Sequence, residues 1–208
     1  PTAGGSQEEP SLVIEKLVVG WPGGKLVLFE VSLSVAAGES VAIVGRSGIG
    51  KTTLAATVMG LIPPLGGTVK TTGRVRYLAQ NAHVFATSIS ENVRIGCKEA
   101  TESEVLAALD RAGLSMPPGR VIAEDGGTLS GGEAQRLALA RVLVSHDATV
   151  DPAAHDLLIL DEPTEHLDVE TSEALMDDLW ATTTNAAKVV ITHDPLVMAR
   201  CDRVWRIG

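Results

Sequence analysis

Gly45-Arg-Ser-Gly-Ile-Gly-Lys-Thr52 fits the pattern Gly-x-x-x-x-Gly-Lys-Thr, between the apolar run 40–44 and the helical pattern 52–59. Glycines in such a loop let backbone N–H groups converge on phosphate oxygens, and the helix N-terminus adds partial positive charge. Lys51 is expected to neutralise β- and γ-oxygens and to act in catalysis, and the Thr52 hydroxyl is expected to ligate Mg²⁺. The alternative is a glycine-rich turn with an exposed lysine. The predicted phosphate-binding residues are Gly45, Arg46, Ser47, Gly48, Ile49, Gly50, Lys51, Thr52 and Thr53.

A second candidate site follows the apolar run Leu157-Leu-Ile-Leu160, which ends in Asp161 and Glu162. Parallel strands present functional groups at their carboxyl ends, where ligands bind. Asp161 is expected to hold Mg²⁺, directly or through water. Glu162, which would point the other way along the pleat, is a candidate general base for an attacking water. The alternative is that the two carboxylates only cap a turn before Pro163.

A third apolar run, Val189-Val-Ile-Thr-His193, also ends in a polar residue. A single histidine is usually a solvated or hydrogen-bonded residue. At a strand end, in a chain with the two preceding motifs, His193 is interpreted as a sensor of the γ-phosphate. The remaining histidines are expected to be ordinary surface residues: His83, His146, His155 and His166.

Composition limits the possible functions of the chain. Its 208 residues carry a net charge of −9, which disfavours a nucleic-acid surface because such surfaces are basic. No apolar stretch approaches the ~18 residues that span a bilayer. Cys97 and Cys201 have no metal-ligand spacing, so we interpret both as structural thiols of a reducing compartment. Residues 1–10 are rich in Gly, Pro and Glu and are expected to form a linker.

Periodicity predicts a mainly parallel sheet covered by helices, preceded by a β-hairpin. Two of the predicted helices and the helix after Leu129 form a candidate inserted helical subdomain, at about residues 82–145. The predicted strands are 11–19, 26–35, 40–44, 69–78 (interrupted at Gly73), 157–160, 188–192 and 204–207. The predicted helices are 52–59, 88–94, 102–112, 130–144, 171–180 and a short one around 196–199.

Leu129-Ser-Gly-Gly-Glu133 opens a predicted helix between the first two motifs. Alone, this run could be a helix cap with a flexible lead-in. Because the run lies between the phosphate loop and the Asp161-Glu162 motif, it resembles the signature of ATP-binding cassette (ABC) proteins. In that family the signature of one domain closes on the ATP of its partner. The resemblance implies that Ser130, Gly131 and Gly132 bind a γ-phosphate held by another subunit. It also implies an α/β P-loop NTPase core with N-terminal antiparallel strands and an inserted helical subdomain, over residues 11–208.

Three further positions match the family pattern. Trp21 falls where the family carries an aromatic that stacks on adenine, although it could simply be a hairpin packing residue. Gln80 matches the glutamine that joins the core to the helical subdomain and approaches Mg²⁺ and water. Asp168, in Glu165-His-Leu-Asp168, matches the aspartate of the loop that meets the partner domain.

Weaker sequence signals indicate which type of ABC cassette the chain resembles. Residues 85–92 and 124–127 look like those of exporter cassettes, which are fused behind a membrane domain. The run Asp161-Glu-Pro-Thr-Glu-His-Leu-Asp168 is similar to the CydC half of CydDC transporters, which serve cytochrome bd assembly. That resemblance implies export of thiols such as cysteine or glutathione, or a haem-linked role. Some segments depart from exporter cassettes: the stretches 60–80 and 113–124 are shorter, and the loop 146–155 is longer.

The resemblance implies an ATPase that uses ATP and Mg²⁺ and pairs with a second cassette, expected to be a different subunit. Its other partner would be the transmembrane domain of a transporter, at the cytoplasmic face of the inner membrane, with no role for nucleic acid. Alternatives are the ATPase subunit of a different ABC exporter and an importer cassette. Further alternatives are a ribosome-acting cassette protein, which would carry two cassettes, and a DNA-repair ATPase, which would insert a long coiled coil.

Overall fold

The computed structural model describes residues 10–80, 83–123, 129–144, 156–165 and 167–208. The chain divides into two compact units. The first contains residues 1–75, 155–159 and 185–208, and the second contains residues 76–154 and 160–184. Among the described residues, no helix has the length and apolar content that crossing a membrane requires.

An antiparallel sheet forms the N-terminal part of the first unit. Its strands are β1 (Leu12–Gly20), β2 (Leu26–Val35) and β4 (Gly66–Thr71), in the order β2-β1-β4. Leu12 pairs with Val35, and Ile14 pairs with Val69. Alternation in β1 buries Leu12 and Ile14 on one face, as expected for a sheet with one face toward a core.

The second sheet has the order β5-β6-β7-β3-β8, and β3 (Ser40–Val44) pairs in parallel with β7 (Ala187–Ile191) and β8 (Arg203–Arg206). Within the first unit, β5 (Val75–Leu78) and β6 (Leu157–Asp161) contribute only Val75 and residues 157–159. Every residue of β3, β6 and β7 is buried, which explains why apolar residues dominate these strands; the polar exceptions are Ser40, Asp161 and Lys188.

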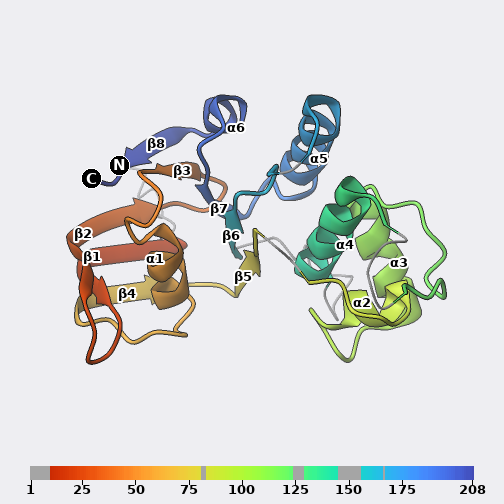
Figure 1. The fold of residues 1–208 in the computed structure, drawn as a ribbon, viewed down its shortest axis with the longest axis horizontal. Helices are drawn as coiled ribbons and strands as arrows, with labels where there is room; N and C mark the ends of the chain where they lie inside the picture. The colour runs from red at the N-terminus through yellow and green to blue at the C-terminus, as the bar shows by residue number, and fades with distance from the viewer. Residues whose placement is uncertain (1–9, 81–82, 124–128, 145–155, 166) are drawn as a thin grey trace, which may run out of the picture. The chain divides into compact units, whose positions relative to one another are not determined.

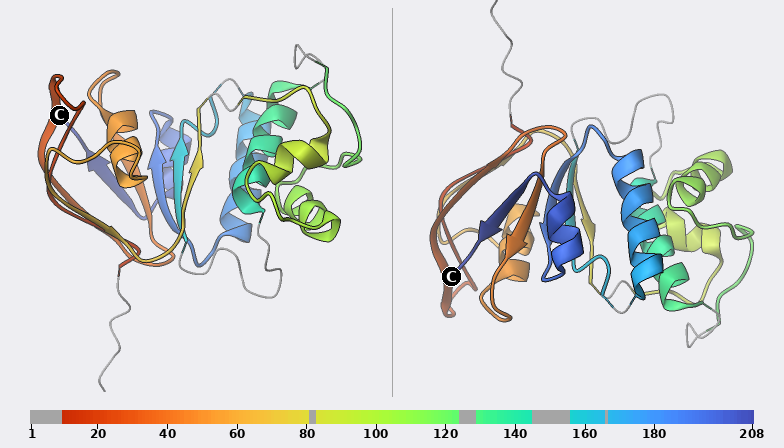
Figure 2. Two further views of the ribbon diagram at one scale, coloured as in Figure 1. Left: turned by 90° about the horizontal axis from the view of Figure 1, so that it is seen from below. Right: turned by 90° about the horizontal axis from the view of Figure 1, so that it is seen from above.

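Helix α1 (Lys51–Val58) packs between the two sheets of the first unit (Figures 1 and 2). Its apolar side chains meet residues from both sheets around one small hollow in the core. The hollow is lined by Leu12, Ile14, Leu33, Ile43, Leu54, Ala55, Val58, Ile159, Val189 and Ile191. Helix α6 (Pro195–Arg200), which Asp194 caps, leads into β8.

In the described part of the second unit the helices are α2 (Ile89–Arg94), α3 (Glu102–Arg111), α4 (Gly131–Leu143) and α5 (Val169–Thr182). Helix α4 contacts the other three (Figures 1 and 2). Each helix begins at a side-chain cap, a device the sequence supplies locally. The four N-caps are Ser88, Thr101, Ser130 and Asp168.

The C-terminus of α4 is held by two arginines from elsewhere in the second unit. Arg76 donates to the carbonyl oxygens of Val142 and Val144, at 2.5 and 2.8 Å. Arg111 donates to the carbonyl of Leu143 at 2.6 Å. These last carbonyls have no intrahelical partner, and cations there complement the helix dipole, so both arginines stabilise this end of α4.

The α/β class and the antiparallel start are confirmed, but one predicted strand is wrong. The run 69–78 is two strands rather than one interrupted at Gly73: β4 joins the antiparallel sheet, and β5 belongs to the parallel one. The bend at 72–74 carries the chain from one sheet to the other, a step that periodicity does not distinguish from a bulge. The predicted linker at 1–10 and the loop 146–155 lie outside the described residues, apart from Pro10. The predicted subdomain boundaries stay a prediction.

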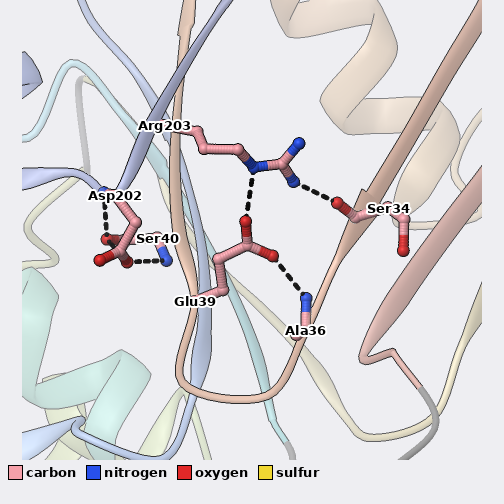
Figure 3. Close-up of polar contacts among 6 residues, drawn as sticks. All are labelled: Ser34, Ala36, Glu39, Ser40, Asp202 and Arg203. Atoms are coloured by element: carbon pink, nitrogen blue, oxygen red, sulfur yellow. Dashed lines mark hydrogen bonds and ion pairs between the residues drawn. The ribbon is translucent and has the colours of Figure 1, made fainter.

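Side chains join β8 to β3 and β2 at the edge of the parallel sheet (Figure 3). Asp202 accepts hydrogen bonds from the Ser40 N–H at 2.8 Å and the Ser40 hydroxyl at 2.6 Å. Arg203 bonds the Glu39 carboxylate and the Ser34 carbonyl, each at 2.5 Å, and Glu39 also accepts from Ala36 N–H at 2.8 Å. These hydrogen bonds lower the pKa of Asp202 below its usual value; the bond from the Ser40 hydroxyl has the larger effect, and the bond from the Ser40 N–H the smaller one.

We predict that Asp202→Ala lowers the free energy of unfolding at pH 7 by about 1 kcal/mol, because two hydrogen bonds to an exposed carboxylate are lost. A carboxylate with a lowered folded pKa stabilises above its unfolded pKa of about 3.9, and this contribution is lost as pH falls through the folded pKa. Urea unfolding should therefore show the difference at pH 7 and its disappearance in acid. A difference that persists below both pKa values would contradict this explanation, and the exposed Asp110→Ala serves as the control.

Candidate functional site

The loop between β3 and α1 lies in the first unit and is built on glycine. Gly50, the N-cap of α1, has φ of +111° and no side-chain cap. A Cβ at Gly50 would lie 2.1 Å from the Val27 side chain, and one at Gly45 would lie 2.7 Å from the Ile207 carbonyl. The first N–H groups of a helix lack intrahelical acceptors, so this start of α1 offers donors to an anion.

Lys51 bends back over the loop. Its ammonium donates to the carbonyl of Gly45 at 2.8 Å and to that of Arg46 at 3.3 Å. The cation is thus held at the loop whose amides would receive phosphates, and its role in neutralising them stays a prediction. Thr52 is exposed in the first turn of α1, so its hydroxyl is a hard oxygen donor of the kind Mg²⁺ prefers.

His193 lies at the same edge of the parallel sheet as this loop. It follows β7, the neighbour of β3, and Thr192 N–H donates to the Ile43 carbonyl at 3.3 Å. The parallel pairing therefore brings His193 and the phosphate loop, distant in sequence, to the carboxyl ends of adjacent strands. His193 itself is exposed. Trp21, also in the first unit, is 57% exposed in the turn between β1 and β2, so its ring is not a packing residue of the hairpin core.

In the second unit, the end of β6 carries a buried carboxylate. Asp161 is 3% exposed, and the Tyr77 hydroxyl donates to its Oδ2 at 3.0 Å. Burial, then the charge of Asp161, raises the pKa of Tyr77 well above its usual value, so the hydroxyl stays protonated and remains a donor. The carboxylate of Asp161 and the amide oxygen of Gln80, in the same unit, are hard donors that fit Mg²⁺.

Glu162 does not continue the pleat of β6. The strand ends at Asp161, and Glu162 has φ of +47°, a left-handed conformation that is uncommon outside glycine. The direction of its side chain is therefore set by this turn and not by strand alternation, which corrects the argument from the pleat. Strained backbone of this kind is found at functional sites, where surrounding contacts maintain it.

Two glutamines hold the turn that follows β6. Gln135, from α4, donates to the Pro163 carbonyl at 3.0 Å. Gln80 donates from Nε2 to the carboxylate of Glu165. Tyr77, Gln135 and Glu165 were missed by sequence reasoning. The signal for Tyr77 was only its position three residues before Gln80, and the signal for Glu165 was its position inside the run 161–168.

The signature run opens α4 with a reciprocal cap. Glu133 N–H donates to the Ser130 hydroxyl at 3.2 Å, and Ser130 N–H donates to the Glu133 carboxylate at 2.7 Å. The bond from the Ser130 N–H is the main reason that the pKa of Glu133 lies below its usual value. By helix geometry, the N–H groups of Gly131 and Gly132 have no acceptor within α4 and can serve a ligand.

Two helix N-termini meet beside this run. A Cβ at Gly132 would lie 2.8 Å from the Thr171 methyl group, so glycine permits the start of α4 to approach α5. Asp168 caps α5, accepting from Thr171 N–H at 2.9 Å, which lowers the pKa of Asp168. A hollow of about 500 Å³ opens here, and Ser130, Gly131 and Gly132 line it together with Asp168.

The described residues form no cluster of three or more His, Cys, Asp or Glu side chains suited to a metal ion. Cys97 and Cys201 are both free and half-buried, and burial raises the pKa of the Cys201 thiol to about 11, consistent with a structural role. His146, His155, His166 and residues 124–127 lie outside the described part of the chain.

We predict that Gly50→Ala lowers the free energy of unfolding by about 2–4 kcal/mol, because it adds left-handed strain and a clash with Val27. Gly48→Ala is the matched control: its φ is +75°, but nothing lies within 4 Å of its Cβ. It should cost only about 1–2 kcal/mol of strain. Urea unfolding measures both, and equal losses would contradict the clash.

The model of the ABC transporter family matches residues 28–165. The chain is 33% identical over 202 residues to a probable ABC transporter ATP-binding/permease protein of Haemophilus influenzae, covering 88% of this chain and 35% of that protein. It is 31% identical over 216 residues to the glutathione/L-cysteine transport system ATP-binding/permease protein CydD of Bacillus subtilis, covering 95% of this chain and 36% of that protein.

Among solved structures, a bacterial Atm1-family ABC exporter with ATP bound is similar to this chain. The match covers 100% of this chain and 39% of the exporter chain. The TM-score is 0.81 and the sequence identity is 27%. The chain thus spans about a third of the length of the curated relatives described above. It belongs to the ABC transporter family, as an ATPase domain of the exporter type.

Proposed function

We propose that this chain binds ATP with Mg²⁺ and hydrolyses it while paired with a second ATPase domain, and that this cycle powers an exporter. The observation that carries the proposal is the loop at residues 45–52. Its glycines hold a conformation that other residues cannot adopt without clash or strain, and the ammonium of Lys51 lies over it. A glycine-rich turn with an exposed lysine would not need that geometry.

In this mechanism the phosphate loop binds the β- and γ-phosphates through its N–H groups, and Lys51 neutralises them. Thr52, Asp161 and Gln80 would hold Mg²⁺, which when bound offsets the charge that develops on the phosphate oxygens. Glu162 accepts the proton of the attacking water. Trp21 would stack on the adenine, which its exposure allows.

The remaining residues act at the γ-phosphate. His193, at the carboxyl end of β7, would donate a hydrogen bond to it. Ser130, Gly131 and Gly132 would receive the γ-phosphate of the partner domain, since their hollow lies at a helix N-terminus. Asp168 lines the same hollow, and the loop that carries it would meet the partner domain. Closure of two such domains excludes bulk water, so hydrolysis requires the pair.

We further propose that the partner is a different subunit and that the whole transporter resembles the CydDC type, located at the cytoplasmic face of the membrane. Two observations support this: the run at residues 161–168, and the presence of a glutathione/L-cysteine transport protein among the relatives. A thiol compound, or a haem-linked cargo, is then the proposed substrate of the whole transporter.

Replacing the loop cation should abolish nucleotide binding. In Lys51→Ala, we expect ATP affinity measured by calorimetry to fall below detection, because the phosphates lose their main counter-charge. The exposed Lys98→Ala is the charge-matched control and should bind as the wild type does. Thermal melting of both variants separates loss of binding from loss of folding. Normal ATP hydrolysis by Lys51→Ala would overturn the proposed function.

Removing the general base should trap the ATP-bound state, together with whichever partner domain is present. In Glu162→Gln, we expect ATP to bind normally and turnover to fall by about 10²–10⁴. Size-exclusion chromatography of this variant with ATP then shows whether the chain pairs with itself. A dimer indicates that the transporter has two identical ATPase subunits, and an ATP-bound monomer indicates that the partner is a different subunit. Wild-type turnover in this variant would show that Glu162 is not the base.

A further inference from the structure

We propose that Glu165 is a positioning residue that fixes which end of the Gln80 amide faces bound Mg²⁺. This role rests on the function proposed above, since it presumes that Gln80 acts at a nucleotide. Its direct basis is the hydrogen bond from Gln80 Nε2 to the Glu165 carboxylate. Both side chains are half-buried and belong to the second unit, although they are 85 positions apart in sequence.

The chemistry of the pair determines its orientation. An ionised carboxylate only accepts hydrogen bonds, whereas a glutamine amide donates at one end and accepts at the other. Glu165 therefore selects the NH₂ end of Gln80 and turns the Oε1 end away from itself. Oxygen is the ligand that Mg²⁺ prefers, so this is the productive orientation for holding the ion.

Glu165 is itself held in place by the turn after β6. Its N–H donates to the Glu162 carbonyl at 3.1 Å, and Gln135 fixes the intervening Pro163 from α4. The acceptor that orients Gln80 is thus on the same anchored turn as Glu162, the proposed base. Gln80 and Glu162 are consequently placed by one short segment, and the negative charge of Glu165 specifies the amide end.

A glutamine at position 165 tests this argument. In Glu165→Gln the new amide has the same shape but can donate as well as accept, so Gln80 would be satisfied in either orientation. The loss of a charged acceptor should weaken cation binding by about three- to tenfold. The readout is the half-saturating Mn²⁺ concentration with the ATP-bound 208-residue chain, measured by electron paramagnetic resonance without turnover.

Nucleotide affinity in EDTA should stay unchanged in Glu165→Gln, because the phosphate loop is untouched. The matched control is Glu173→Gln, which removes the same charge from an exposed position of α5 and should bind Mn²⁺ as the wild type does. A purely structural role of Glu165 would change the EDTA affinity or the melting temperature, and would leave the Mn²⁺ midpoint alone.

A double-mutant cycle with Gln80→Ala completes the test. If Glu165 acts through Gln80, Glu165→Gln should have no further effect on the Mn²⁺ midpoint in the Gln80→Ala background. Additive losses, or a wild-type midpoint in Glu165→Gln alone, overturn the positioning role and leave the proposed function standing. A wild-type chain that binds no nucleotide contradicts the proposed function, and with it the role of Gln80.

Discussion

Hydrogen bonding of β3 to a parallel strand on each side is the constraint on which the first unit depends. The strand is completely buried, so its backbone groups must pair, and β7 and β8 supply the partners. The pairing ends at Val44, where the chain must leave the sheet. The loop that follows therefore begins at the carboxyl edge of the sheet, and parallel pairing brings the end of β7, which His193 follows, to the same edge.

The edge of that sheet is maintained by polar contacts around β8. Asp202 accepts hydrogen bonds from the N–H and the hydroxyl of Ser40. Arg203 links Glu39 to β2 by donating to both the Glu39 carboxylate and the Ser34 carbonyl. These contacts fix where β8 begins, and β8 brings the Ile207 carbonyl against Gly45. A glycine is required at position 45 because of this close approach, so a network far from the loop in sequence contributes to the shape of the loop.

The second unit places its functional groups by anchoring one turn and one helix. The turn 161–165 receives hydrogen bonds from Tyr77, Gln80 and Gln135, and Glu162 lies within this turn in a left-handed conformation. Helix α4 is fixed at its start by the reciprocal cap of Ser130 and at its end by arginines. A helix held at both ends presents its N-terminal amides in a constant position, which suits the binding of an anion.

The sequence alone was sufficient to predict the α/β class and the antiparallel N-terminal strands, because these depend on local patterns of apolar residues and turn residues. The phosphate-binding role of the glycine-rich loop stays a prediction. The sequence also predicted which strand ends carry Asp161 and His193. Tertiary structure decided the rest. The run 69–78 divides between two sheets because strand pairing, not periodicity, assigns each half. Glu162 departs from strand alternation because its backbone is left-handed, which no pattern in the sequence indicated. The contact of Gln80 with Glu165 joins segments 85 positions apart, and only the folded chain brings them together.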